Sequence, residues 1–274
     1  MIRMKRALLF TVQLSCSAIL FRIIHCGNLV AKMRPLKKDT RLVKSLHQKK
    51  FRKEYGLFIV EGLKMVEEAL NSGFKCEALY TTDDEWSARH PEAIRIPRSD
   101  MEQMSALSSP SGFLAVLGQR NSGLPMPGGH VVVLDGISDP GNFGTILRSA
   151  EWFGITNVLC TTDSVELYNP KTVQSTMGSL FRVNVHYDVT STLVEWLKSH
   201  DYKLIGADMK GEVAFTYSYP KRTALIIGSE SHGIRPVMKD LLDATVTIPG
   251  AGKAESLNAS VAASILLAEL FRRS

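Results

Sequence analysis

The segment from residue 131 to residue 160 constrains the fold of this 274-residue chain more than any other. It reads VVVLDGI, SDPGNFG, TILRSAEWFG and ITNVLC, that is, a short apolar run, a turn rich in Gly, Pro and Asn, an amphipathic stretch and a second apolar run. This pattern predicts a βαβ unit of a parallel sheet, with its first strand buried on both faces. Such sheets bind ligands at the carboxyl ends of their strands, here the loop 138–144.

Arg148 is unusual within the predicted helix of this unit. If Thr145 is the N-cap, Arg148 occupies the third helical position, where the helix dipole disfavours a cation. If Asn142 caps the helix instead, Arg148 moves to the second turn and the conflict shrinks. Because local rules are broken most often at functional sites, two interpretations stay open, a functional arginine and an ordinary solvated one.

Basic residues are concentrated near the start of the chain, whose net charge is +6. Nine of its 33 lysines and arginines lie between Arg34 and Lys53, against the single acid Asp39, and acidic residues outnumber basic ones from Glu54 onward. Such a segment suits a polyanionic partner, although a charge run is usually a solvated helix face. The four cysteines and seven histidines are scattered, so neither a disulfide framework nor a metal site is predicted.

Residues 1–33 combine a basic start, MIRMKR, with the apolar run ALLFTVQLSCSAILF, as secretory signals do. The run is followed by Arg22 and His25 rather than by a small-residue cleavage site, and it is short for a membrane span. We therefore predict an unstructured extension, or a start codon assigned too early with Met33 as the natural start. The protein is expected to be cytoplasmic, with no stable membrane partner.

Two domains are predicted after this extension. Residues 34–119 predict a small α/β domain that begins with a basic amphipathic stretch, and residues 120–129, RNSGLPMPGG, predict a linker. Residues 130–274 predict the domain with the parallel sheet. Helices are expected at 61–71, at 101–107 with Ser99 as cap, at 171–179, 191–200 and 259–271, and strands at 57–60, 77–80, 113–117, 181–186, 203–207, 223–227 and 245–249.

The last predicted helix, 259–271, is apolar on nearly all sides. A helix without a polar face has to be covered on two sides, by its own sheet and by another subunit. The sequence therefore predicts a homodimer.

Three predicted strands of the second domain end in loops rich in Gly, Asn, Ser and Glu, at 138–144, 228–233 and 250–258. If these loops meet at one sheet edge, they build a pocket lined by main-chain groups. In chain order the loops read D-P-x-N-x-G-x-x-x-R, G-x-E-x-x-G-I and I-P-x-x-G-x-x-E-S-L-N. This set resembles the SpoU, or TrmH-type, RNA ribose 2′-O-methyltransferases. Residues 50–53, KFRK, and 58–62, FIVEG, are similar to the family's substrate-binding domain.

The resemblance covers the chain from about Arg34 onward, and it implies a fold, an activity and partners. The fold is an α/β SPOUT methyltransferase domain with a trefoil-knotted parallel sheet, preceded by a small α/β RNA-binding domain. The activity is methyl transfer from S-adenosylmethionine to a ribose 2′-hydroxyl of ribosomal or transfer RNA, with ribosomal RNA favoured. The enzyme would be a homodimer with both active sites at the interface. Knots are nearly absent among folds, so this one rests on the resemblance alone.

Motif positions assign candidate residues by the same resemblance. The candidates for catalysis are Asn142, Arg148, Glu230, Ser256 and Asn258. The candidates for holding the methyl donor through backbone groups are Gly228, Ile248 and Leu257, and those for contacting RNA are Lys49, Lys50, Arg52 and Lys53. The chain departs from the commoner family pattern at Gly250-Ala251 and Ser231-His232, which puts details of the pocket in doubt.

The chemistry of methyl transfer fits these residue types. A ribose hydroxyl is a poor nucleophile, so it needs alignment with the methyl group and a path for its proton. A guanidinium is a poor free base because it does not lose its proton in proteins, but the planar fork of Arg148 suits the phosphate beside the target ribose. A general-base role stays open.

The other candidates each have a structural and a functional interpretation. Asn142 either holds Arg148 or the ribose, or it caps its own helix. Glu230 either fixes its loop or forms an ion pair with Arg148, or it is an ordinary surface carboxylate. Ser256 and Asn258 position the substrate or cap the last helix.

Three other classes of protein were weighed. Gly141-x-x-Gly144 with Asp163 loosely resembles a dinucleotide-binding oxidoreductase, but the G-x-G-x-x-G fingerprint is missing. A non-catalytic RNA-binding protein of the same fold is disfavoured by the intact motifs. A secreted protein would use Asn258-Ala259-Ser260 as a glycosylation acceptor, which its place inside the third loop disfavours.

Overall fold

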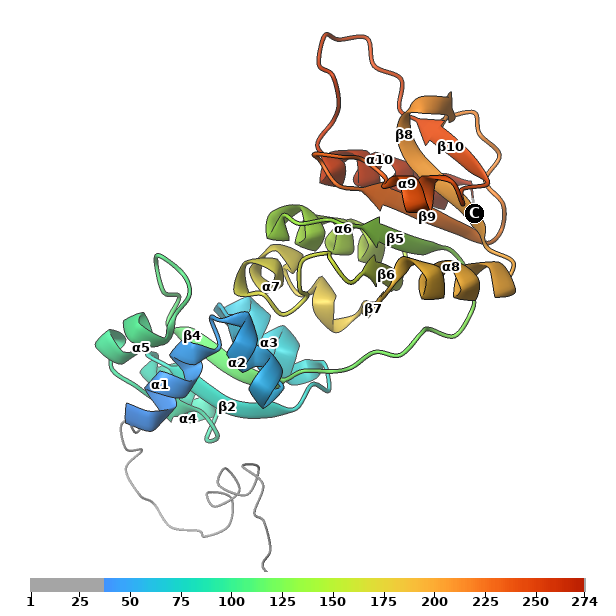
Figure 1. Cartoon of the computed structure of the whole chain (residues 1–274). Coiled ribbons are helices and arrows are strands. Elements are labelled where there is room, and N and C mark those ends of the chain that lie inside the picture. The colour runs from blue at the N-terminus through green and yellow to red at the C-terminus, as the bar shows by residue number, and fades with distance from the viewer. Residues whose placement is uncertain (1–36, 274) are drawn as a thin grey trace, which may run out of the picture. The chain divides into compact units, whose positions relative to one another are not determined.

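The computed structural model describes residues 37–273 (Figure 1). The predicted N-terminal extension, its signal-like run and its alternative start at Met33 lie outside the described residues. The predicted boundaries at 34–119, 120–129 and 130–274 stay predictions. Among the helices described, none is long and apolar enough to cross a membrane.

The first half of the described chain forms a four-stranded sheet with the order β1-β4-β2-β3, in which β4 is antiparallel to both of its neighbours. Its elements are α1 (Lys37–Ser45), α2 (Lys49–Tyr55), β1 (Leu57–Glu61), α3 (Leu63–Asn71), β2 (Cys76–Thr81), α4 (Asp84–Arg89), β3 (Ile94–Arg95), α5 (Arg98–Met104) and β4 (Phe113–Gly118). The short elements α4 and β3 were not predicted from the sequence. The cap predicted for α5 is wrong, because Pro97 occupies the N-cap position and Ser99 lies inside the helix.

The second half forms a six-stranded sheet with the order β10-β8-β9-β5-β6-β7, in which every pair of neighbours is parallel. Its elements are β5 (Val131–Asp135), α6 (Pro140–Trp152), β6 (Asn157–Thr161), α7 (Pro170–Thr176), a 3₁₀ turn η2 (Ser179–Phe181), β7 (Asn184–Asp188), α8 (Thr190–Ser199), β8 (Lys203–Val213), β9 (Thr223–Gly228), α9 (Pro236–Lys239), β10 (Ala244–Thr247) and α10 (Ala259–Arg272). This α/β architecture agrees with the predicted fold class. The trefoil knot stays a prediction for this chain.

The central strand β5 is buried along its whole length, as its continuous apolar run predicts. Val132 and Leu134 lie in a hydrophobic cluster with residues of α6, α7 and α10. Val131 and Val133 lie in a second cluster, with residues of α8 and α9. Because side chains alternate along a strand, the two clusters mark the two covered faces of the sheet.

Arg52 is buried, and its predicted contact with RNA is wrong. Its side chain is only 2% exposed, and its Nη1 donates hydrogen bonds to the carbonyl oxygens of Leu46 (2.8 Å) and His47 (2.9 Å). Its Nη2 and Nε bind Glu166, which follows β6, at 2.8 and 3.2 Å. The guanidinium therefore joins the turn between α1 and α2 to the second sheet.

The segment 120–129 is tied to the second half of the chain by tyrosine and histidine side chains. Tyr168 Oη donates to the carbonyl of Arg120 (3.1 Å) and accepts from its amide (3.0 Å), and Tyr202 Oη accepts from the amide of Gly128 (3.0 Å). The ring Nδ1 of His186 hydrogen-bonds the carbonyl of Ser122 at 2.8 Å. The predicted linker is thus fastened at three points.

We expect Arg52→Gln to lower the free energy of unfolding by about 3 kcal/mol, because Glu166 and two carbonyls lose their partner together. Lys53→Gln, an exposed neighbour on α2, is the matched control and should change stability by less than about 0.5 kcal/mol. Urea unfolding of both variants measures the difference. Equal stabilities would show that the buried ion pair contributes nothing beyond a surface charge.

Candidate active site

Helix α6 begins earlier than either predicted cap. Asp139 is the N-cap, and its side chain accepts a hydrogen bond from the Asn142 amide at 2.7 Å. Pro140 takes the first helical position, where its missing N–H costs nothing. Arg148 therefore lies in the third turn, and the predicted conflict with the helix dipole disappears.

The side-chain amide of Asn142 joins the three predicted loops. Its Nδ2 donates to Glu230 Oε1, and its Oδ1 accepts from Asn258 Nδ2 and Ser260 Oγ, each at 3.0 Å. The loops therefore meet at one edge of the sheet, as the sequence predicts. Asn142 neither caps α6 nor binds Arg148, and Glu230 partners the amide rather than the arginine.

Asn258 caps the last helix, which is one of the two tasks that the sequence leaves open, and it also binds Asn142. Its Oδ1 caps α10 by accepting from the amides of Ser260 (2.9 Å) and Val261 (3.3 Å), while its Nδ2 binds Asn142. Sequence reasoning missed Ser260, whose Oγ lies within hydrogen-bond reach of both asparagines. Its position two residues after a capping Asn was the available signal.

Gly228, at the end of β9, lies where its own loop folds back over it. A Cβ at this position would stand 2.1 Å from the carbonyl carbon of Gly233 and 2.2 Å from the amide of Ile234. Ser229 and Gly233 exchange two backbone hydrogen bonds, of 2.8 and 3.1 Å, which close the loop. Only glycine allows this approach, and it leaves the carboxyl end of β9 without a side chain.

Gly144 allows α6 and α7 to pack closely. A Cβ on Gly144 would lie 2.0 Å from Ser175 Oγ and 2.9 Å from the Ser175 carbonyl carbon. Ser175 Oγ donates to the carbonyl of Pro140 at 2.9 Å, so α7 contacts the first turn of α6. The glycine of the first motif is therefore a packing residue, which positions the start of α6.

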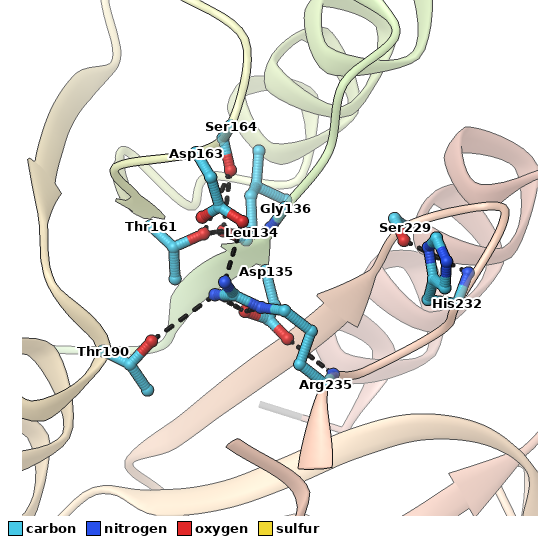
Figure 2. Close-up of polar contacts among 10 residues, drawn as sticks. All are labelled: Leu134, Asp135, Gly136, Thr161, Asp163, Ser164, Thr190, Ser229, His232 and Arg235. Carbon is cyan, nitrogen blue, oxygen red and sulfur yellow. Dashed lines mark hydrogen bonds and ion pairs between the residues drawn. The ribbon is translucent and has the colours of Figure 1, made fainter. Parts of the chain in front are cut away.

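Arg235 ties together the loops that follow β5, β6 and β9 (Figure 2). Asp135, the last residue of β5, has a fully buried side chain, which accepts from the Arg235 amide (2.8 Å), from Nε (2.8 Å) and from Nη2. Arg235 Nη1 binds Asp163 at 2.7 Å, and Nη2 lies 3.4 Å from Thr190 Oγ1. These hydrogen bonds, first of all those to Asp135, raise the pKa of Arg235 above its ordinary value.

The remaining candidates are not joined to this network. Arg148 is exposed and has no hydrogen bond or ion pair to any described residue. Ile248 follows β10 and packs against the core, whereas Ser256 and Leu257 are exposed. Residues 37–273 hold no cluster of three or more His, Cys, Asp or Glu side chains that could bind a metal ion.

A parallel α/β sheet whose polar loops meet at its carboxyl edge defines a ligand-binding enzyme of the α/β class. Comparison with known proteins narrows this class. Residues 129–268 match the SpoU rRNA Methylase family, and residues 37–115 match the MRM3-like substrate binding domain. The chain belongs to the SpoU rRNA methylase family, which confirms the resemblance seen in the sequence.

Curated relatives and solved structures are similar over most of the chain. A 23S rRNA (uridine(2479)-2′-O)-methyltransferase of Streptomyces viridochromogenes is 30% identical, covering 80% of this chain and 83% of the relative. A 23S rRNA (guanosine(2553)-2′-O)-methyltransferase of Bacillus subtilis is 30% identical, covering 83% and 93%. A putative TrmH-family RNA methyltransferase structure from Porphyromonas gingivalis has a TM-score of 0.81 at 32% identity, covering 88% and 100%. An AdoMet-bound rRNA methyltransferase from Sinorhizobium meliloti has a TM-score of 0.80 at 28% identity, covering 88% and 97%.

We expect Arg235→Gln to lower the free energy of unfolding by about 3 kcal/mol, because the carboxylate of Asp135 stays buried without its cation. Asp163→Asn is the matched control: it removes an exposed partner of the same guanidinium and should cost less than about 1 kcal/mol. Adding Asp135→Asn to Arg235→Gln should restore part of the loss, since no buried charge then remains. Urea unfolding of the four proteins measures these terms, and equal losses for Arg235→Gln and Asp163→Asn would contradict the role of the buried pair.

Proposed function

We propose that this protein transfers a methyl group from S-adenosylmethionine to a ribose 2′-hydroxyl of ribosomal RNA. The observation that carries the proposal is that the side chain of Asn142 joins the three loops that contain the family motifs, through hydrogen bonds to Glu230 and Asn258. Family membership supports RNA ribose 2′-O-methylation as the reaction, and the printed names of two relatives favour 23S rRNA as the substrate. We further propose that the reaction uses no metal ion and takes place in the cytoplasm, where ribosomal RNA is found.

The carboxyl end of β9 fits a donor that is held by backbone groups. Gly228 has no side chain there, and its loop is closed by its own hydrogen bonds, so main-chain groups are left to face a ligand. We assign Gly228, Ile248 and Leu257 to the donor. S-adenosylmethionine supplies an electrophilic sulfonium methyl group when bound.

Arg148 is proposed to hold the phosphate beside the target ribose. Its guanidinium is exposed and without a partner among the described residues. A bidentate contact with phosphate orients the neighbouring 2′-hydroxyl, whose proton passes to a phosphate oxygen or to water. Asn142, Glu230 and Asn258 hold the three loops together, and the exposed Ser256 is assigned to the substrate.

RNA binding is proposed to extend to the basic helix α2. Lys49, Lys50 and Lys53 are exposed on it, whereas Arg52 is committed to Glu166. Lysine ammonium groups bind phosphates as point charges, so these three contacts would give affinity without sequence preference.

The homodimer is proposed to form through α10 and the end of α6. One side of α10 is buried in the core, but Val261 is 47% and Phe271 60% exposed. Phe271 packs against Phe153, at 5.8 Å between ring centroids, and the neighbouring Trp152 is 80% exposed. A second copy would cover these apolar side chains, as the sequence pattern of the helix predicts.

Arg148→Lys keeps the charge but loses the planar fork, so we expect single-turnover methyl transfer to fall about 100-fold. The assay uses 23S rRNA fragments that span the sites named for the two relatives, with saturating donor. Calorimetry should find S-adenosylmethionine affinity unchanged in the variant, because Arg148 does not hold the donor. Near-normal turnover of the lysine variant would contradict the phosphate contact.

The same measurements test the proposed activity itself. Methylation of neither fragment, with RNA still bound, would favour a non-catalytic RNA-binding protein. Tight NAD binding with no S-adenosylmethionine binding would favour the oxidoreductase.

Light scattering should give the mass of a dimer at micromolar concentration. Val261→Glu and Phe271→Glu should shift the protein to monomers, because each places a charge in the apolar contact. Val237→Glu is the control: Val237 is 58% exposed on α9, which covers the other face of the sheet. A monomeric wild type, or equal behaviour of all three variants, would contradict the proposed interface.

A further inference from the structure

A cleft of about 770 Å³ lies between β1 with the loops beside it and the helices α6 and α7. His47, Ile59 and Leu107 line it from the first half of the chain, and Pro140, Lys171 and Gln174 line it from the second. This volume is within the range of about 300–1,000 Å³ that small-molecule sites occupy. Nothing in the proposed transfer of the methyl group uses this cleft.

The cleft combines aliphatic walls with polar groups that have no partner. Ile59, Leu107 and Val173 give it apolar surface. The ammonium group of Lys171 and the side-chain amide of Gln174 make no hydrogen bond or ion pair with any described residue. The acid in the lining, Glu61, is 4% exposed and already accepts from the amide of Ala106 at 2.8 Å. An apolar slot with one free cation and one free amide matches a nucleotide, which has a flat base, polar base edges and a phosphate.

The position of the cleft connects the two regions already assigned to RNA. Pro140 is the first residue of α6, two residues before Asn142, and its carbonyl is held by Ser175 of the cleft wall. On the opposite side, His47 hydrogen-bonds the carbonyl of Met104 at 2.9 Å and directly precedes the segment that leads to the exposed lysines of α2. An RNA strand that reaches from α2 to the start of α6 would pass this cleft.

We infer that the cleft holds the unstacked base of a nucleotide next to the methylated one, with Lys171 on its phosphate and Gln174 on its base edge. This inference rests on the proposed function, because it takes RNA as the substrate. Proteins read RNA sequence mostly from unpaired bases that are splayed out of the stack. The cleft would thus contribute to the choice of the methylated site, a task that the backbone-held donor and the phosphate contact of Arg148 cannot perform.

The experiment compares Lys171→Ala and Gln174→Leu with the control Lys198→Ala in the full-length protein. Lys198 is exposed on α8, which covers the opposite face of the second sheet. The substrates are the 23S rRNA fragments described above, each made with all four bases at the two positions that flank the target. The readouts are KM for RNA, kcat, donor affinity and RNA affinity as a function of salt.

Lys171→Ala should raise KM for RNA about tenfold and lower the salt slope of RNA binding by about one, with donor affinity unchanged. Gln174→Leu should remove the preference of the wild type for one flanking base, because an apolar side chain cannot read a base edge. The inference is overturned if both variants equal Lys198→Ala in KM, salt slope and base preference.

A second measurement keeps the test independent of catalysis. A photoreactive 4-thiouridine at each flanking position should cross-link to residues 171–175 of the wild type. Cross-links that fall only outside the cleft overturn the inference even if the RNA is methylated. If no fragment is methylated, the proposed function fails, whereas cross-linking and salt dependence of binding still decide on the cleft.

Discussion

The buried carboxylate of Asp135 is the constraint on which the geometry of the site depends. An ionised carboxylate without solvent is stable only if protein groups replace its water. Asp135 finds these groups in the amide and guanidinium of a single residue, Arg235, one hundred positions later in the chain. The hydrogen bonds of this one pair therefore hold the end of β5 and the loop after β9 together.

The side-chain amide of Asn142 binds the loop after β9, which the pair of Asp135 and Arg235 holds in place. Its nitrogen needs an acceptor and its oxygen needs donors, and the three loops supply Glu230, Asn258 and Ser260. An aspartate at this position would place a second carboxylate against Glu230, and a leucine would leave all three partners without their bond. An amide has a donor group and an acceptor group on the same side chain. This explains why an asparagine suits a position between the loop that contains Glu230 and the loop that caps α10.

Local sequence patterns, such as apolar runs and helical periodicity, predicted most of the fold. The apolar run of β5, the glycines of its loop and the periodicity of α6 are local signals, and the structure confirms this βαβ unit. The cap of α6 was misplaced because Thr145 and Asn142 are as good capping types as Asp139, and only the preference of Pro140 for the first helical position separates them. The short elements α4 and β3 carry too few residues for any period to show.

Contacts between distant residues set the limit of prediction for the site. Motif order predicted that the loops containing Asn142, Glu230 and Asn258 meet, but it could not show which atoms bind. Arg52 was assigned to RNA because its neighbours are basic, and its true partner, Glu166, lies 114 positions away with no pattern that links them. Charge patterning describes a segment as a whole, whereas burial is a property of one side chain.

Arg52 also makes the basic helix α2 part of the contact between the two halves of the chain. Arg52 with Glu166, and Arg182 with Glu68, join the first half of the chain to the second at 2.8 and 2.9 Å. Phe58 of β1 also packs against Tyr168, at 4.4 Å between ring centroids. These contacts join α2, which carries the exposed lysines, to the half of the chain that contains α6. The cleft is lined from both halves of the chain, so its shape depends on these ion pairs and on this ring contact.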